Sequence, residues 1–197
     1  MEVLKQEVVR HVVNLESCLL NWLATGDRED MIRVVCGGPG SGKSSFCKIF
    51  ASRLSEEKDL SVLFIPLHQF DPSGDLNTAL NNFIQADIEK NLPPNPLERQ
   101  NATSRVLVIF DGLDELSMQG EVAAQVAQDF VREVQKKLLG FNQSQARVFV
   151  LLSGRDLVVQ SNRTEFRREE QILHLLPYFS TQQELRKHQH DESTELT

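Results

Sequence analysis

The chain has 197 residues, of which 40% are hydrophobic and 25% charged, a composition typical of a folded domain and unlike that of a disordered tail. Its net charge of −7 argues against a general nucleic-acid-binding protein, which needs many Lys and Arg side chains on phosphates, but leaves room for one local basic site. The longest apolar runs, such as 106–110 and 148–152, are far shorter than the about 20 residues of a membrane-spanning helix, so we expect a cytoplasmic protein without a membrane span or secretory signal.

Segments of helical and of strand character alternate along the chain. Apolar residues three and four positions apart predict amphipathic helices, whereas short apolar runs predict buried strands. In chain order we expect a helix over 3–23, a strand over 31–36, a helix over 43–54, a strand over 60–67, a helix from about 75 to 88, a strand over 106–110, a helix over 122–138, a strand over 147–152 and a weaker strand over 172–176. This alternation predicts an α/β fold with a mostly parallel sheet of about five strands and helices on both faces.

Glycine and capping residues mark the limits of these elements. Gly26 ends the first helix, Ser73 or Asp75 can cap the third, and Gly140 stops the fourth. Beyond the last strand the chain is almost wholly polar, as expected of a solvated end. We therefore expect three parts, which are an N-terminal amphipathic helix (1–27), a core (28–178) and a polar C-terminal segment (179–197).

Residues 37–44 read Gly-Gly-Pro-Gly-Ser-Gly-Lys-Ser and fit the pattern GxxxxGK followed by Ser or Thr. Glycines allow backbone N–H groups to approach phosphate oxygens, and the helix that follows points its free N–H groups at the same charge. Lys43 supplies a positive charge for the β- and γ-phosphates, and Ser44 a hydroxyl ligand for Mg²⁺. The predicted nucleotide-binding residues are Gly37, Gly38, Pro39, Gly40, Ser41, Gly42, Lys43, Ser44 and Ser45.

A second motif follows the strand over 106–110, which runs into Asp111-Gly112-Leu113-Asp114-Glu115. Ligands of parallel sheets bind beyond the carboxyl ends of the strands, so we expect Asp111 to lie beside the glycine loop and to hold Mg²⁺ directly or through water. The three acids repel one another unless a cation is nearby. We assign Glu115 to polarise the attacking water, with Asp114 as the competitor, and the alternative interpretation is a turn of three solvated acids.

Together with Leu151-Leu152-Ser153-Gly154-Arg155, these two motifs resemble a NACHT-type domain of the STAND class of P-loop NTPases, and the resemblance covers about residues 20–178. The form hhhhDGhDE, where h is apolar, discriminates this family from other P-loop proteins. The resemblance implies a three-layer P-loop core, ATP or GTP bound with Mg²⁺, and slow hydrolysis. It further implies a switch between a closed monomer and an assembled oligomer, in innate immunity, programmed death or prokaryotic antiviral defence.

Some positions depart from that family. It often carries a Thr-Ser-Arg-like sensor where this chain has Ser153, Gly154 and Arg155. Arg155 either senses the γ-phosphate or pairs with Asp156 or with the Asp114/Glu115 cluster. Other arginines that could face a neighbouring subunit are Arg163, Arg167 and Arg168. No winged-helix segment, effector domain or sensor repeats are evident, so we expect a fragment, a truncated gene or a subunit that contacts separate effector and sensor domains.

Two other functions stay open at this point. One is a metabolic P-loop kinase or other small P-loop ATPase, and the other is a nucleotide-binding interaction module without turnover. The base is not readable, and ATP is favoured over GTP by the resemblance alone.

The cysteines and several aromatic or imidazole side chains receive structural interpretations. Cys18, Cys36 and Cys47 lack metal-site spacing and are predicted to be reduced thiols packed as small apolar residues. Trp22 is expected to pack against the sheet rather than stack on adenine. His174 is expected to be a core or edge residue, whereas His188 and His190 could bind a metal only opportunistically.

Overall fold

The computed structural model describes residues 12–72, 74–86, 95, 97, 105–117, 121–166 and 168–176. Within them, five strands form one parallel sheet in the order β2-β3-β4-β1-β5. The strands are β1 (Ile32–Cys36), β2 (Leu60–Pro66), β3 (Arg105–Asp111), β4 (Val148–Gly154) and β5 (Ile172–His174). The predicted α/β class, with a parallel sheet of about five strands, is confirmed.

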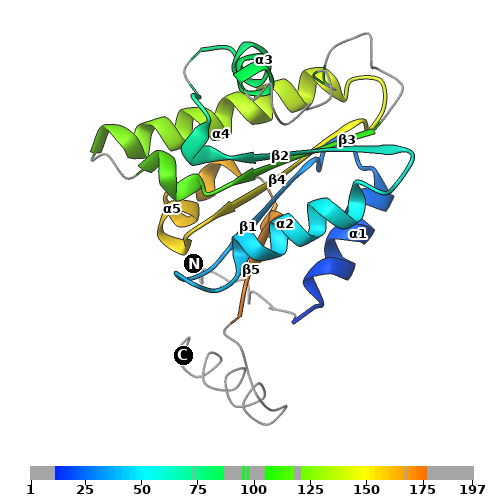
Figure 1. The fold of residues 1–197 in the computed structure, drawn as a ribbon. Helices are drawn as coiled ribbons and strands as arrows, with labels where there is room; N and C mark the ends of the chain where they lie inside the picture. The colour runs from blue at the N-terminus through cyan, green and yellow to red at the C-terminus, as the bar shows by residue number, and fades with distance from the viewer. Residues whose placement is uncertain are drawn as a thin grey trace, which may run out of the picture.

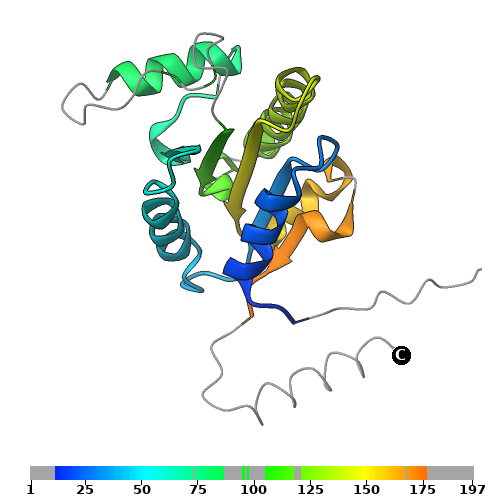
Figure 2. The same cartoon turned by 90° about the vertical axis from the view of Figure 1, so that its right-hand side faces the viewer.

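Helices cover both faces of this sheet, as predicted. They are α1 (Leu15–Thr25), α2 (Lys43–Leu54), α3 (Leu76–Ala86), α4 (Glu121–Phe141) and α5 (Asp156–Ser161). Figure 1 shows α1 and α2 on one face and α4 on the other, with α3 beside α4. The view in Figure 2 shows the sheet passing between α2 and α4, which makes the three layers. No helix in the described part of the chain has the length and apolarity that a membrane crossing requires.

The face covered by α4 is held by a cluster of phenylalanine rings. Phe110 of β3 meets Phe130 of α4 edge to face, with ring centroids 5.0 Å apart, and Phe70 packs on both rings and on Phe83 of α3. Phe70, Phe110 and Phe130 are each at most 5% exposed. Since a fully buried Phe contributes roughly 1.5–3 kcal/mol of transfer free energy, this cluster is a main source of the stability that fixes β3 in place.

On the opposite face, Trp22 of α1 packs against the sheet. Its ring packs edge to face on Phe149 of β4 at a centroid distance of 5.4 Å, and its Nε1 donates a hydrogen bond of 2.7 Å to the carbonyl of Asp30. Only 5% of the residue is exposed. The prediction that Trp22 packs against the sheet is confirmed.

The start of the first helix differs from the prediction of 3–23. Residues 12–14 are not helical, and α1 begins at Leu15, because the Asn14 side chain accepts a 2.9 Å hydrogen bond from the Ser17 N–H and so caps the helix there. The predicted part over 3–11 lies outside the described residues. Gly26 ends α1 as predicted, in the left-handed conformation with φ of 60°.

Other boundaries shift by a few residues. Asp75 caps α3 by accepting hydrogen bonds from the N–H groups of Asn77 and Thr78, while Ser73 lies outside the described residues. α4 continues through Gly140 to Phe141, and β5 stops at His174. The described residues also contain elements that were not predicted. These are the short helix α5 and the 3₁₀ helices η1 (Leu67–Gln69), η4 (Leu113–Ser117), η5 (Arg163–Glu165) and η6 (Glu169–Gln171). The segment 179–197 lies outside the described residues.

Candidate functional site

The order of the strands places the predicted motifs at one edge of the sheet. β1 and β4 are neighbours, yet the chain leaves β1 through α2 toward β2 and leaves β4 through α5 toward β5, on the other side. A crevice forms beyond the carboxyl ends of strands where their connections diverge in this way. The glycine loop follows β1, Gly112 follows β3 and Arg155 follows β4, so the three sequence motifs meet at this carboxyl edge.

The glycine loop is shaped to receive an anion. Gly40 and Gly42 have φ of 70° and 90°, which side chains disfavour, and a Cβ on Gly37 would lie 3.0 Å from the Ser41 hydroxyl. Gly42 caps α2 without any side-chain hydrogen bond. The first N–H groups of α2 therefore have no side-chain cap, and the positive end of the helix faces the loop.

Lys43 lies folded over this loop. Its Nζ donates hydrogen bonds of 2.8 Å to the carbonyls of Gly37 and Gly38 and one of 3.2 Å to the Ser41 hydroxyl. These partners are neutral, so a phosphate oxygen that reached the same ammonium would make a stronger, charge-assisted bond. The arrangement keeps a full positive charge inside the concave side of the loop.

Asp111 and two serine hydroxyls form a compact group of oxygens beside the loop. The Ser44 hydroxyl donates to Oδ1 of Asp111 at 3.1 Å, and the Ser153 hydroxyl donates to the same oxygen. Ser153 in turn accepts a 3.0 Å hydrogen bond from the Gly112 N–H. Asp111 is 8% exposed. Mg²⁺ prefers oxygen ligands such as carboxylates and hydroxyls. The side chains of Ser44 and Asp111 are therefore chemically suited to the Mg²⁺ ion predicted from the sequence.

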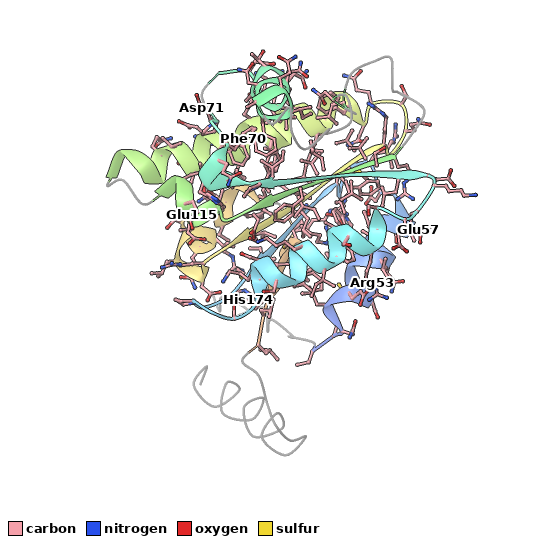
Figure 3. All side chains as sticks on the ribbon, in the orientation of Figure 1. Arg53, Glu57, Phe70, Asp71, Glu115 and His174 are labelled. Atoms are coloured by element: carbon pink, nitrogen blue, oxygen red, sulfur yellow. The ribbon has the colours of Figure 1, made fainter. Side chains whose placement is uncertain are left out.

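The two candidate catalytic acids, Asp114 and Glu115, both follow the turn at Gly112, where φ is 92°. Asp114 pairs with Arg155, with Nε to Oδ2 at 2.9 Å, and its side chain is 13% exposed. Glu115 is exposed, and Figure 3 shows it at the carboxyl edge of the sheet. Arg155 thus makes one of the ion pairs that the sequence left open, and Glu115 is exposed to solvent.

The remaining predicted loop residues also lie at this edge. Gly38, Pro39 and Gly40 are exposed, and Ser45 is exposed in the first turn of α2. Of the other arginines, Arg168 pairs with Asp27 at the opposite, amino edge of the sheet, at 2.9 Å, and Arg167 lies outside the described residues.

The cysteines behave as predicted in their packing. All three are free, Cys36 and Cys47 are fully buried and Cys18 is half-buried. Burial raises the pKa of the Cys47 thiol to about 12, and the neighbouring Asp111 carboxylate adds to the effect. The Cys47 thiol therefore stays neutral beneath the site.

Sequence reasoning missed the contact between Ser153 and Asp111. The two residues are distant in the chain, and β4, which carries Ser153, stands beside β3, which carries Asp111. A serine near the carboxyl end of an apolar strand was the available signal, since neighbouring parallel strands end at the same edge. Only knowledge of the strand order turns that signal into a contact.

Known proteins resemble this chain in sequence and in fold. Residues 32–191 match the family model described as the NACHT domain. The fold is similar to that of the Aeropyrum pernix ORC2 protein in its ADPNP-ADP complexes, with a TM-score of 0.53, 17% identity and coverage of 84% of this chain and 46% of that chain. For the ADP form of the same protein the TM-score is 0.52 at 17% identity, covering 95% of this chain and 55% of that chain.

At this level of identity the likeness shows the fold alone. The chain spans about half the length of these solved structures, 46% and 55% respectively. Among curated proteins, none matches this sequence.

Proposed function

The chain belongs to the NACHT domain family, in the STAND class of P-loop NTPases, and on that premise we propose that it binds ATP with Mg²⁺ and hydrolyses it slowly. The observation that carries the proposal is the set of contacts around the glycine loop. Lys43 lies 2.8 Å from the Gly37 and Gly38 carbonyls, and the Ser44 hydroxyl lies 3.1 Å from Asp111. A cationic cradle and an oxygen pair for a divalent metal thus stand side by side at one edge of the sheet.

In this proposal each residue has a separate task. The loop N–H groups and Lys43 hold the phosphates, and Ser44 and Asp111 hold Mg²⁺, which would neutralise charge on the β- and γ-phosphates. The Ser153 hydroxyl orients the Asp111 carboxylate through their direct hydrogen bond. The Ser44 hydroxyl and the Asp111 carboxylate already share a hydrogen bond, so both oxygens would need to move little to hold the metal.

The water-polarising role goes to Glu115 rather than to Asp114. Asp114 is paired with Arg155 at 2.9 Å and its side chain is largely buried, whereas Glu115 is exposed to solvent. A carboxylate that is already hydrogen-bonded to a guanidinium has fewer free acceptor sites for a water molecule than one that is exposed to solvent. If nucleotide binding broke the Arg155–Asp114 ion pair, Arg155 would be free to contact the γ-phosphate. That is the sensor role which the family resemblance implies for this residue.

We further propose that the nucleotide state controls assembly. The family to which the chain belongs suggests a cytoplasmic signal-transduction module that changes between a closed monomer and a homo-oligomer, or that contacts separate effector and sensor domains, in innate immunity or antiviral defence. The test is to identify the nucleotide that co-purifies with the protein, and then to measure its mass in solution with Mg-ATP and with ADP. A larger species with ATP alone supports the switch, and the same mass in both states contradicts it.

Turnover is tested with Glu115→Gln. We expect this variant to keep its affinity for Mg-ATP while kcat falls about a hundredfold, since a positioned general base contributes about 10²- to 10⁴-fold. Asp114→Asn is the matched control and should lower kcat less. The reverse ranking would transfer the role to Asp114, and a parent protein that binds ATP without any hydrolysis would instead be an interaction module.

A further inference from the structure

A second group of reactive side chains meets at the carboxyl edge, outside the glycine loop and the Ser44–Asp111 pair. Cys36 ends β1, Asp156 opens α5 and His174 ends β5. Sγ of Cys36 lies 3.2 Å from Nδ1 of His174, and the same Nδ1 lies 3.4 Å from Oδ1 of Asp156. One donor atom from each residue lies within 4.8 Å of the other two.

The backbone, and not chance side-chain placement, brings these groups together. Cys36 and His174 are register partners in the parallel pair of β1 and β5, so their side chains leave the sheet next to each other on the same face. Asp156 is fixed at the start of α5, which packs against the end of β1. In Figure 3, His174 marks the position of this group, at the lower end of β5.

Hydrogen bonding leaves one ring nitrogen of His174 shared between two neighbours. Both the thiol and the carboxylate approach the same ring nitrogen, Nδ1 of His174. That nitrogen carries either one proton or one lone pair. With a proton it can donate to one neighbour well, and with a lone pair it would face the negative carboxylate. A single cation between the three atoms would satisfy all of them at once.

Two of the three separations between the donor atoms fit a tetrahedral metal. With Zn–S of about 2.3 Å and Zn–N or Zn–O of about 2.0–2.1 Å, tetrahedral angles place sulfur and nitrogen roughly 3.6 Å apart and nitrogen and oxygen roughly 3.4 Å apart. The observed sulfur–nitrogen and nitrogen–oxygen separations are 3.2 Å and 3.4 Å, so these two pairs need to change by only a few tenths of an ångström. The sulfur and the carboxylate oxygen lie within 4.8 Å of each other. Thiolate, imidazole and carboxylate together select Zn²⁺ over Mg²⁺, which prefers oxygen alone.

We propose that Cys36, Asp156 and His174 form a Zn²⁺ site, with solvent in the fourth position. The Cys36 side chain is fully buried and forms the floor of the site. The side chains of His174 and Asp156 are 58% and 40% exposed, so the ion enters from the solvent side. Three protein ligands and one open position are a common zinc geometry.

A nucleophilic cysteine is the other chemistry that these residue types suggest, and the structure argues against it. Burial raises the pKa of the Cys36 thiol to about 12, and its contact with Asp156 adds to the effect. A reactive cysteine needs the opposite shift. A bound cation, by contrast, deprotonates a coordinating thiol outright, so metal binding would release the thiol proton.

The ion would tie β5 to the glycine loop. Gly37 directly follows Cys36, and the Leu175 N–H, next to His174, donates a 2.7 Å hydrogen bond to the Cys36 carbonyl. A Cβ on Gly37 would lie 3.2 Å from the Leu175 Cβ, which shows how closely the two segments pack. None of the three ligands is among the predicted nucleotide-binding residues, so zinc binding can be tested independently of the proposed ATPase function.

The test uses the full chain after treatment with a chelator, in a background where His188→Ala and His190→Ala remove the histidines of the polar tail. Zn²⁺ is titrated in competition with a chromophoric chelator. We expect one equivalent to bind, and His174→Ala and Asp156→Asn to weaken binding at least tenfold. The exposed His68→Ala is the matched control and should bind Zn²⁺ as the background protein does.

Co²⁺ reports on the sulfur ligand. We expect the Co²⁺-loaded protein to show a sulfur-to-metal charge-transfer band that is lost in Cys36→Ser and kept in Cys18→Ser. Equal Zn²⁺ affinity in His174→Ala and its background would overturn the proposal, as would a band that persists in Cys36→Ser. His174 is mostly exposed, so its variant keeps the test decisive even where Cys36→Ser fails to fold, with folding checked by circular dichroism.

Discussion

At the amino edge of the sheet, Asp30 accepts two hydrogen bonds of 2.6 Å from Arg33, whereas at the carboxyl edge Asp111 accepts hydrogen bonds from the hydroxyls of Ser44 and Ser153. Both carboxylates are 8% exposed. The first is neutralised by a guanidinium, whereas the second is hydrogen-bonded only to neutral hydroxyl groups. The fold therefore pairs the buried carboxylate at one edge with a positive charge, and the one at the other edge with neutral groups.

Further interactions surround the Asp30–Arg33 pair at the amino edge. The Arg33 guanidinium lies over the Trp22 ring at 5.2 Å, and Gln171 donates a 2.9 Å hydrogen bond to Asp30. The Arg168 guanidinium also lies 3.8 Å from the Asp30 carboxylate. These groups come from α1, β1 and the segment before β5, so the network joins distant parts of the chain. We infer that this edge contributes stability, while the carboxyl edge contributes binding.

The largest expected effect is on stability, at the amino edge. Asp30→Asn removes the charge that balances the buried Arg33, and breaking such a pair costs about 3 kcal/mol or more because one charge is left without a counterion. We expect the free energy of unfolding in urea to fall by that amount while affinity for Mg-ATP stays unchanged. The exposed Asp59→Asn is the matched control and should change stability by about 0.5 kcal/mol or less.

A loss of nucleotide affinity in Asp30→Asn, at temperatures where it remains folded, would contradict the division of roles between the two edges.

The second effect is on binding, at the carboxyl edge. Lys43→Ala removes an ammonium that would make charge-assisted hydrogen bonds to phosphate, which together contribute about 3 kcal/mol, or roughly a hundredfold in Kd. We expect Mg-ATP affinity to fall by that factor, measured by calorimetry, while the free energy of unfolding changes by about 1 kcal/mol or less. Lys48→Ala, on an exposed position of α2, should leave the affinity intact.

If the Lys43 variant bound Mg-ATP as tightly as the parent protein, the proposed nucleotide site would be wrong.

The sequence predicted what is encoded in contiguous residues. The glycine loop, Lys43 and the run from Asp111 to Glu115 are local patterns, and the strands before them are apolar runs, so the sheet and its carboxyl-edge motifs could be anticipated. The predicted start of the first helix was wrong because apolar spacing continues upstream of Asn14, whereas the cap at that residue makes the helix begin at Leu15. Periodicity reports which face a helix would bury, and capping decides where it begins.

Contacts between distant segments could not be predicted. Ser153 meets Asp111, and Cys36 meets His174, only because β4 lies between β3 and β1 and because β5 lies beside β1. Alternating apolar segments predict a parallel sheet but leave the order of its strands open. The same holds for the amino edge, where Gln171 reaches Asp30 across the end of the sheet.

The smallest expected effect is the pH dependence of stability, which again belongs to the amino edge. Burial alone would raise the pKa of Asp30, but hydrogen bonds from Arg33 and Gln171 and the nearby guanidinium charges lower it below its ordinary value of 3.8. A carboxylate with a depressed pKa in the folded state stabilises the fold above its unfolded-state pKa and loses that contribution as pH falls through the folded-state pKa. Urea unfolding measured from neutral pH down to about pH 3 should therefore show a decline in stability below about pH 4 that is shallower in Asp30→Asn. Equal slopes in the variant and the parent protein would mean that the acid sensitivity arises elsewhere, and the pairing at this edge would then contribute to stability without contributing to its pH dependence.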